Sequence, residues 1–154
     1  MSALTPGVRL GVDVGDVRVG VAICDPDGRL ATPLATVPRD QNPGKRTIPS
    51  DMSELARLAA EHGTVEIVVG LPMTLAGAEG PAAVQVRSYV DRLATVVAPV
   101  PVTLTDERMS TLVATRRLSE RGVRGRRRRK VVDQLAAAEI LQGWLDAQRR
   151  RTSR

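Results

Sequence analysis

The sequence predicts a mixed α/β fold in which an antiparallel meander is followed by alternating helices and strands. Two alternating apolar runs stand close together in residues 9–24, and the later part of the chain alternates strand-like runs with helical apolar stripes. The 154 residues are enough for one domain with its own core, which we expect over 1–148 with a flexible basic tail over 149–154. Hydrophobic residues make up 42% and charged residues 26%, which is typical of globular chains.

The first part of the chain is expected to form three antiparallel strands. Apolar residues alternate over 9–15 and again over 17–24, the pattern of two half-buried strands. The tetrapeptide at 25–28 (Asp-Pro-Asp-Gly) is a strong turn signal. A third strand follows over 30–37, in which Pro33 indicates an edge position or a bulge.

The rest of the chain is expected to alternate helices and strands. The motif Asp51-x-x-Glu54 resembles a capping box and Gly63 marks a helix end. Pro81 suits the first position of a helix. The expected elements are a helix from Ser50 or Asp51 to Gly63, a strand over 66–70, a helix from Pro81 through Val97, a strand over 102–106, a helix from Ser110 or Thr111 to Gly122, and a last helix that follows the basic segment 124–130 and ends near Arg150.

The scarcity of three residue types limits the chemistry. A single cysteine, Cys24, excludes a disulfide framework and a cysteine-based zinc site, and we expect it to be a buried thiol, with an inter-subunit disulfide as the alternative. The single histidine, His62, excludes a histidine metal cluster. Phenylalanine is absent and there is one Trp and one Tyr, which argues against a module that stacks RNA bases on aromatic rings. Chemistry therefore falls to carboxylates, hydroxyls, Lys and Arg.

The net charge of +6 is unevenly placed. Residues 121–154 hold 11 basic and 3 acidic side chains, so the last 34 residues carry +8 and the first 120 carry −2. This asymmetry indicates a polyanionic partner, and a solvated basic loop is the alternative. The basic segment that we expect to bind nucleic acid comprises Arg124, Arg126, Arg127, Arg128, Arg129 and Lys130. Neither a membrane-spanning run nor a signal pattern is visible, so we expect a cytoplasmic protein without a membrane partner.

Three positions supply candidate catalytic carboxylates. Asp13 shares one strand face with Gly11 and Gly15, which would leave room for a phosphate or a metal ion, although the glycines could equally serve a turn. Asp106 and Glu107 end a strand and point to opposite faces, so only one of them can face Asp13, and the spacing does not choose between them.

Asp133 is aligned with the apolar stripe of the last helix, at its N-terminal end. Apolar residues stand three, four, seven, eight, eleven and twelve positions after it. The alternatives are an N-cap and a carboxylate held against the sheet beside Asp13. Carboxylates without His or Cys suit Mg²⁺ or Mn²⁺. Two such ions would turn a charge of −3 into +1 and could support in-line phosphodiester hydrolysis.

The sequence resembles the YqgF/RuvX family of Holliday junction resolvases and pre-16S rRNA nucleases. Four blocks in the family's order carry the resemblance and span about residues 9 to 146. They are Gly11-Val12-Asp13-Val14-Gly15 with Arg18-Val19-Gly20-Val21-Ala22; Gly70-Leu71-Pro72 with Gly77 and Glu79-Gly80-Pro81; Asp106-Glu107-Arg108 with Ser110 and Thr111; and Lys130-Val131-Val132-Asp133 with Ala136-Ala137 and Ile140-Leu141-Gln142.

The resemblance implies an RNase H-like fold, with a mixed five-stranded sheet flanked by helices on both faces. It implies a metal-dependent nuclease in which Asp13, Glu107 and Asp133 are catalytic metal ligands, and so favours Glu107 over Asp106. Arg18 and Arg108 would contact nucleic acid, Arg108 also as a structural partner. The implied substrate is the 5′ end of pre-16S rRNA, with four-way DNA as the alternative; a resolvase would be expected to act as a homodimer.

Two other classes of protein share parts of this pattern. Gly-x-Asp-x-Gly after a strand also opens actin-like ATPases and sugar kinases, but those proteins need two such lobes and 154 residues supply one. A nucleic-acid binding module with a lost active site is the other class. All three candidate acids are present, which argues against it.

Overall fold

The structure is a computed structural model that describes residues 4–44, 47–109 and 126–152. The expected helix over 110–122 lies outside the described residues. The elements are β1 (Arg9–Val14), β2 (Arg18–Cys24), β3 (Ala31–Pro38), α1 (Ser50–Glu61), β4 (Glu66–Leu71), α2 (Pro81–Val97), β5 (Val102–Asp106), the 3₁₀ turn η1 (Glu107–Met109) and α4 (Arg126–Thr152).

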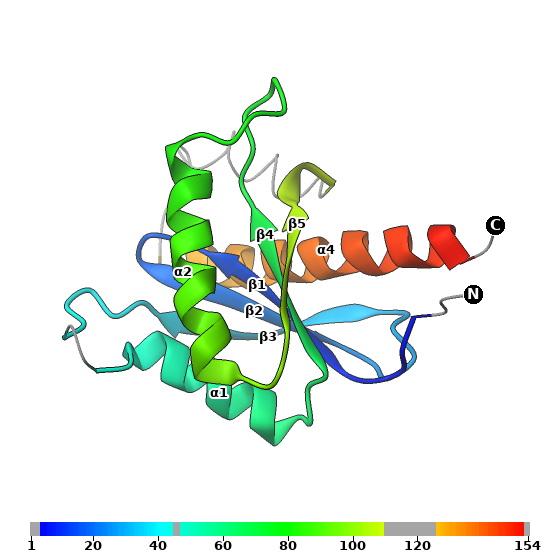
Figure 1. The fold of residues 1–154 in the computed structure, drawn as a ribbon, viewed down its shortest axis with the longest axis horizontal. Helices are drawn as coiled ribbons and strands as arrows, with labels where there is room; N and C mark the ends of the chain where they lie inside the picture. Colours follow the sequence, from blue (N-terminus) through cyan, green and yellow to red (C-terminus); the bar gives the residue numbers. More distant parts are fainter. Residues whose placement is uncertain (1–3, 45–46, 110–125, 153–154) are drawn as a thin grey trace.

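One mixed five-stranded sheet forms the middle layer, with the strand order β3-β2-β1-β4-β5 (Figure 1). β1, β2 and β3 are the expected antiparallel meander, whereas β4 is parallel to β1 and β5 is parallel to β4. β3 is one of the two edge strands of this sheet, and its pairing with β2 shifts register between Val21 and Ala22, opposite Ala35 and Pro33. The sequence signal of Pro33 is therefore confirmed, since both an edge and an irregularity are present.

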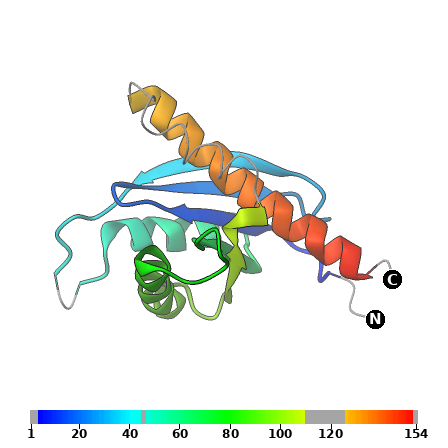
Figure 2. The ribbon, with the colours of Figure 1, turned by 90° about the horizontal axis from the view of Figure 1, so that it is seen from above.

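Helices cover both faces of the sheet, as predicted. α1 and α2 pack on one face and α4 crosses the other (Figure 2). The α1/α2 face holds the larger core, which includes Leu10 and Val12 of β1, Leu55 of α1 and Leu93 of α2. On the α4 face, smaller clusters join Val68 and Cys24 to Leu141 and Leu145, and Ala22 to Ala137.

α4 is tied to the edge strand β3 through its glutamine side chains. Gln142 accepts a hydrogen bond from the Ala31 backbone N–H (2.8 Å) and donates one to the Arg29 carbonyl (2.9 Å). Gln134 donates to the Thr36 hydroxyl at 3.0 Å. Paired backbone groups of this kind blunt an edge strand against other chains.

The predicted start of the first helix at Ser50 is confirmed, but its capping box and the predicted start of the last helix are wrong. The capping box at Asp51 does not form: α1 begins at Ser50 after Pro49 and has no side-chain cap hydrogen bond. Asp51 is instead buried and accepts hydrogen bonds from the Asp40 backbone N–H and the Tyr89 hydroxyl. The last helix does not follow the basic segment but contains most of it, because α4 begins at Arg126.

The single cysteine is buried, as predicted. Cys24 is 3% exposed and its sulfur accepts a hydrogen bond from the Arg9 backbone N–H at 3.3 Å. Burial raises the pKa of the Cys24 thiol, which disfavours the reactive thiolate. His62 stands at the C-cap of α1. None of the described helices is long and apolar enough to cross a bilayer.

Candidate active site

Two buried carboxylates lie together at one edge of the sheet. β1 and β5 run parallel to β4 on its two sides, so the carboxyl ends of the three strands meet at that edge. Asp13 stands near the end of β1 and is 5% exposed; Glu107 directly follows β5 and is 4% exposed. Both line a cavity of about 90 Å³. The other lining residues are Val14, Asp16, Arg39, Gly70, Pro72, Ala82, Gln85 and Val86.

The glycines around Asp13 do not provide the space for a ligand that the sequence suggested. A Cβ built at Gly11 would lie 2.6 Å from the Leu141 Cβ, so the packed helix α4 fills that space. A Cβ at Gly15 would lie 2.7 Å from the Arg18 carbonyl oxygen, and this oxygen accepts a hydrogen bond from the Gly15 N–H. Gly11 therefore serves close helix packing and Gly15 serves the β1–β2 turn.

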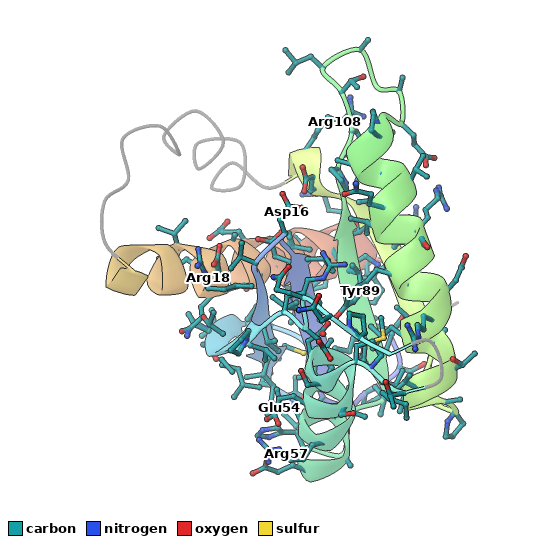
Figure 3. The ribbon with its side chains drawn as sticks, turned by 90° about the vertical axis from the view of Figure 1, so that its left-hand side faces the viewer. Asp16, Arg18, Glu54, Arg57, Tyr89 and Arg108 are labelled. Atoms are coloured by element: carbon teal, nitrogen blue, oxygen red, sulfur yellow. The ribbon has the colours of Figure 1, made fainter. Side chains whose placement is uncertain are left out.

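The structure separates the two adjacent acids that follow β5. Glu107 lines the cavity with Asp13, whereas Asp106 accepts hydrogen bonds from both the backbone and the guanidinium of Arg108. This hydrogen bonding holds the pKa of Asp106 below its usual range. The exposed Arg108 side chain, labelled in Figure 3, also lies close to Gly77, where a Cβ would be 3.3 Å from Nη1. Its contacts in this chain are structural, and its binding of nucleic acid stays a prediction.

Asp133 lies on the α4 side of the sheet and not in the cavity lining. It stands in the third turn of α4, so the N-cap alternative is wrong. Its backbone rests on β2, because a Cβ built at Gly20 would lie 2.1 Å from the Asp133 carbonyl oxygen. Gly20 is the register partner of Asp13. The helix therefore brings Asp133 close to the strand position beside Asp13, as one alternative predicted.

The Asp133 carboxylate forms an ion pair with Arg18 at the start of β2. Arg18 Nε donates to Asp133 Oδ2 at 2.9 Å, and the two side chains are 23% and 16% exposed. Figure 3 shows Arg18 beside α4. Arg18, a predicted nucleic-acid contact, thus holds one of the predicted metal ligands in this structure.

The three predicted metal ligands do not form one cluster. Within the described part of the chain, no group of three or more His, Cys, Asp or Glu side chains is arranged to hold a metal ion. Asp13 and Glu107 do share one cavity, and two buried carboxylates are the kind of donor set that a hard divalent cation uses. The donor set therefore fits such a cation at Asp13 and Glu107, while Asp133 is paired with Arg18 through one of its carboxylate oxygens.

The predicted basic segment lies at the start of α4. Arg126, Arg127, Arg128, Arg129 and Lys130 belong to the first turns of this helix, and Arg124 lies outside the described residues. Figure 2 shows that this end of α4 extends beyond the edge of the sheet.

Sequence reasoning missed three polar residues of the cavity. Asp16, Arg39 and Gln85 line it beside the two carboxylates. Asp16 is in the β1–β2 turn, Arg39 directly follows β3 and Gln85 is on α2. Arg39 carries no sequence signal of this contact, because it only follows the expected third strand and its partners in the cavity are distant in the sequence.

The strand order β3-β2-β1-β4-β5, with helices on both faces of the sheet, defines an RNase H-like fold. Comparison with solved structures supports this class: the chain is similar to a RuvC from T. thermophilus, solved in complex with a Holliday junction substrate, with a TM-score of 0.54, 13% sequence identity and coverage of 96% of both chains. At this identity the likeness concerns the fold.

Residues 7–147 match the family model described as RuvX, Holliday junction resolvase, and the chain belongs to this family. Similar proteins from other organisms carry the name "Putative pre-16S rRNA nuclease". The protein from Streptomyces avermitilis is 51% identical over 93% of this chain and 88% of its own length. The protein from Mycolicibacterium paratuberculosis is 51% identical over 95% of this chain and 84% of its own length. The resemblance in the sequence motifs is thereby confirmed, and the chain is a nuclease.

Proposed function

We propose that the chain is a divalent-cation-dependent nuclease that cleaves phosphodiester bonds at the cavity of Asp13 and Glu107. The observation that carries this proposal is that one cavity holds two nearly inaccessible carboxylates, Asp13 near the end of β1 and Glu107 directly after β5. Acidic side chains are seldom this deeply buried, and clefts that gather such side chains are commonly functional sites.

Asp13 and Glu107 are the residues that would hold Mg²⁺ or Mn²⁺. When bound, such a cation would polarise a phosphoryl oxygen and offset the negative charge of the carboxylates and the phosphodiester. Asp133 is the third proposed ligand. α4 places its backbone against Gly20 of β2, which is the register partner of Asp13. A second cation would need a carboxylate beyond Asp13 and Glu107, and Asp133 would supply it. The ion pair with Arg18 holds the Asp133 side chain in position.

The basic start of α4 is the proposed binding surface for the nucleic-acid backbone. Residues 126–130 are all Arg or Lys, and they precede Asp133 on the same helix. Neutralising Arg126 to Arg129 together should weaken nucleic-acid binding and make the affinity less dependent on salt concentration. With fewer phosphate contacts, binding releases fewer counterions from the nucleic acid. Titrations at several salt concentrations measure this slope; an unchanged slope would place the nucleic acid elsewhere.

We propose the 5′ end of pre-16S rRNA as the substrate, acted on in the cytoplasm, because relatives with about half of their residues identical carry that nuclease name. The family description and the likeness to a RuvC favour a second candidate, a four-way DNA junction. A junction requires two symmetric cuts, so this candidate goes with a homodimer, whereas trimming of a single strand does not.

One preparation should be offered both substrates side by side. A precursor 16S rRNA leader and a four-way DNA junction are incubated with Mg²⁺, with Mn²⁺ and with a chelator, and the products are mapped by length. The proposal expects cation-dependent cleavage of the leader at defined positions. Cleavage of only the junction would transfer the activity to the second candidate. Intact binding of both substrates without cleavage under any cation would mark a binding module and overturn the proposal.

A further inference from the structure

A second, larger cavity adjoins the candidate active site. It has a volume of about 510 Å³ and lies between the loop after β3, the start of α1 and the side of α2. Asp16, Arg39 and Gln85 line both this cavity and the smaller one that holds Asp13 and Glu107. We refer to the larger cavity as the flanking cavity. Its remaining lining residues are Asp40, Gln41, Pro43, Pro49, Asp51, Met52, Ser88, Tyr89 and Arg92.

Arg39 is held firmly at the boundary between the two cavities. Its backbone N–H donates to the Val17 carbonyl at 2.8 Å, and its Nη1 donates to the Gly15 carbonyl at 3.0 Å. Its guanidinium carbon also lies 4.9 Å from the centre of the Tyr89 ring, within the range of a cation–π contact. A guanidinium has five N–H donors in a planar fork, so these contacts fix its position and leave donors for a phosphate.

The ring of Tyr89, which is labelled in Figure 3 and contacts Arg39, is itself held in place. Its hydroxyl donates to the buried Asp51 carboxylate, which also accepts the Asp40 backbone N–H at 3.0 Å. Burial and this hydrogen bond raise the pKa of the Tyr89 hydroxyl, so the ring keeps its proton and remains a donor. The Arg39 guanidinium therefore rests on a rigid support, and rigid placement lowers the entropy cost of binding a ligand.

The acids of the flanking cavity are largely engaged by backbone donors. Asp40 accepts the Asn42 and Ser50 backbone N–H groups, both at 3.1 Å. Asp51 is engaged by Tyr89 and Asp40, as described. Asp16 is exposed at the shared boundary. On the far side of the cavity, Arg92 donates to the Thr47 carbonyl at 2.6 Å. Arg39 and Arg92 are thus the two cations of the cavity, among the residues that the structure describes.

We propose that the flanking cavity is a nucleotide subsite of the nuclease, which takes the unpaired nucleotide next to the scissile phosphate. Its volume lies in the range of small-molecule sites and its lining is polar. Arg39 and Arg92 bind the strand's phosphates, and Gln41, Gln85 and Ser88 offer amide and hydroxyl groups to the base or sugar. The subsite rests on the proposed function, because it has a role in cleavage only if cleavage occurs at Asp13 and Glu107.

The test begins with binding in the absence of cleavage. Short single-stranded RNA and DNA oligonucleotides of one sequence are titrated in a chelator, at several salt concentrations, against the wild type, Arg92→Ala, Arg39→Ala and Arg57→Ala. Arg57 is the matched control, since it removes the same charge from an exposed face of α1 where it pairs with Glu54 and Glu61. Arg92→Ala and Arg39→Ala should each weaken binding about tenfold and lower the salt slope by about one. Arg57→Ala should change neither.

Cleavage then tests whether the cavity lies next to the scissile phosphate. One substrate lacks the nucleotides on the side of the scissile phosphate that would enter the flanking cavity. With the wild type, kcat/KM for this shortened substrate should be about tenfold lower than for the full-length substrate. The same shortening should cost the Arg92→Ala variant much less, because its contact is already absent. Arg92→Lys should recover part of the binding, since it restores the charge without the planar fork. Thermal unfolding of every variant monitors folding.

The outcomes separate this inference from the proposed function. Equal binding by Arg92→Ala, Arg39→Ala and Arg57→Ala would overturn the subsite while leaving the nuclease proposal standing. Failure of the wild type to cleave with Mg²⁺ or Mn²⁺ would count against the nuclease proposal, and the titrations in chelator would still report whether the cavity holds a strand. Additive effects of shortening and Arg92→Ala would also overturn the subsite.

Discussion

The two faces of the sheet are packed in opposite ways. The α1/α2 face is filled by large aliphatic side chains, including Leu10, Leu55, Ile67 and Leu93, all fully buried. The α4 face contains glycines where its strands meet the helix. Cβ atoms built at Gly11, Gly20 and Gly70 would each lie within 2.7 Å of an atom of α4.

This difference separates stability from chemistry. Large buried side chains stabilise the fold by removing apolar area from water, and the α1/α2 face supplies most of it. The glycines of the α4 face give up such area and in return allow the α4 backbone to touch β2 at Gly20, one strand away from Asp13. The α1/α2 face therefore provides most of the hydrophobic core, while close packing on the α4 face places Asp133 near the candidate active site.

The largest effect is expected at the two cavity carboxylates. Asp13→Asn and Glu107→Gln should each lower the cleavage rate about 10³-fold, because each variant removes several kcal/mol of charge stabilisation at the cation. Single-turnover cleavage with Mg²⁺ and with Mn²⁺ measures the loss. Asp106→Asn is the matched control, since Asp106 is the adjacent acid and pairs with Arg108 outside the cavity. Full activity in Asp13→Asn would contradict the proposed mechanism.

Closing the space on the α4 face should destabilise the protein by about 3 kcal/mol. In Gly20→Ala the new methyl group would lie 2.1 Å from a backbone oxygen of Asp133, which cannot rotate away. Urea unfolding measures the change. Gly63→Ala is the control: nothing lies within 4 Å of its Cβ, and only its positive φ of 58° costs energy, about 1 kcal/mol. Equal losses in both variants would mean that α4 does not lie closely on β2.

A smaller effect is expected at Cys24, which packs on the α4 face. Cys24→Ala should cost about 1 kcal/mol through the small cavity it leaves. In the native protein the thiol should react with a disulfide reagent at least about 10²-fold more slowly than in the unfolded protein, because burial hides it and raises its pKa. Rapid native reaction, or a dimer band that reducing agent removes, would revive the inter-subunit disulfide.

The smallest effect concerns the ion pair between Arg18 and Asp133. A double-mutant cycle with Arg18→Ala and Asp133→Asn should give a coupling free energy of about 0.5 kcal/mol, because both side chains are partly solvated. Denaturant unfolding of the four proteins measures it. A coupling near zero with a large loss of cleavage in Asp133→Asn alone would assign Asp133 to the chemistry and not to the pairing.

Much of the fold could be predicted from the sequence because its signals are local. Alternating apolar residues set β1 and β2, and Pro33 marked the edge strand. The Asp51 prediction failed because a capping box and a buried acid share one pattern. What distinguishes them is a hydroxyl donor from Tyr89, which is 38 residues away in the chain.

The site was predictable only in part, for a similar reason. Motif resemblance selected Glu107 over Asp106, and the structure places Glu107 in the cavity with Asp13. The packing role of Gly11 could not be predicted from the β1 sequence, because the side chain that packs against it, Leu141, is near the other end of the chain. Arg39 carried no signal because its neighbours in space come from a turn and a distant helix.

The uninterrupted course of α4 has a geometric consequence. Arg126 and Asp133 belong to one helix, and seven residues advance about 10 Å along a helix axis. If residues 126–130 formed a flexible loop, their position relative to the sheet would vary. A continuous helix instead fixes this spacing. Under the proposed function, a nucleic-acid backbone bound at the first turns of α4 would lie at a constant distance from Asp133 and from β2, on which the Asp133 backbone rests. The cleavage position would then depend on the distance between the basic start of α4 and the carboxylates, and not only on the sequence of the nucleic acid.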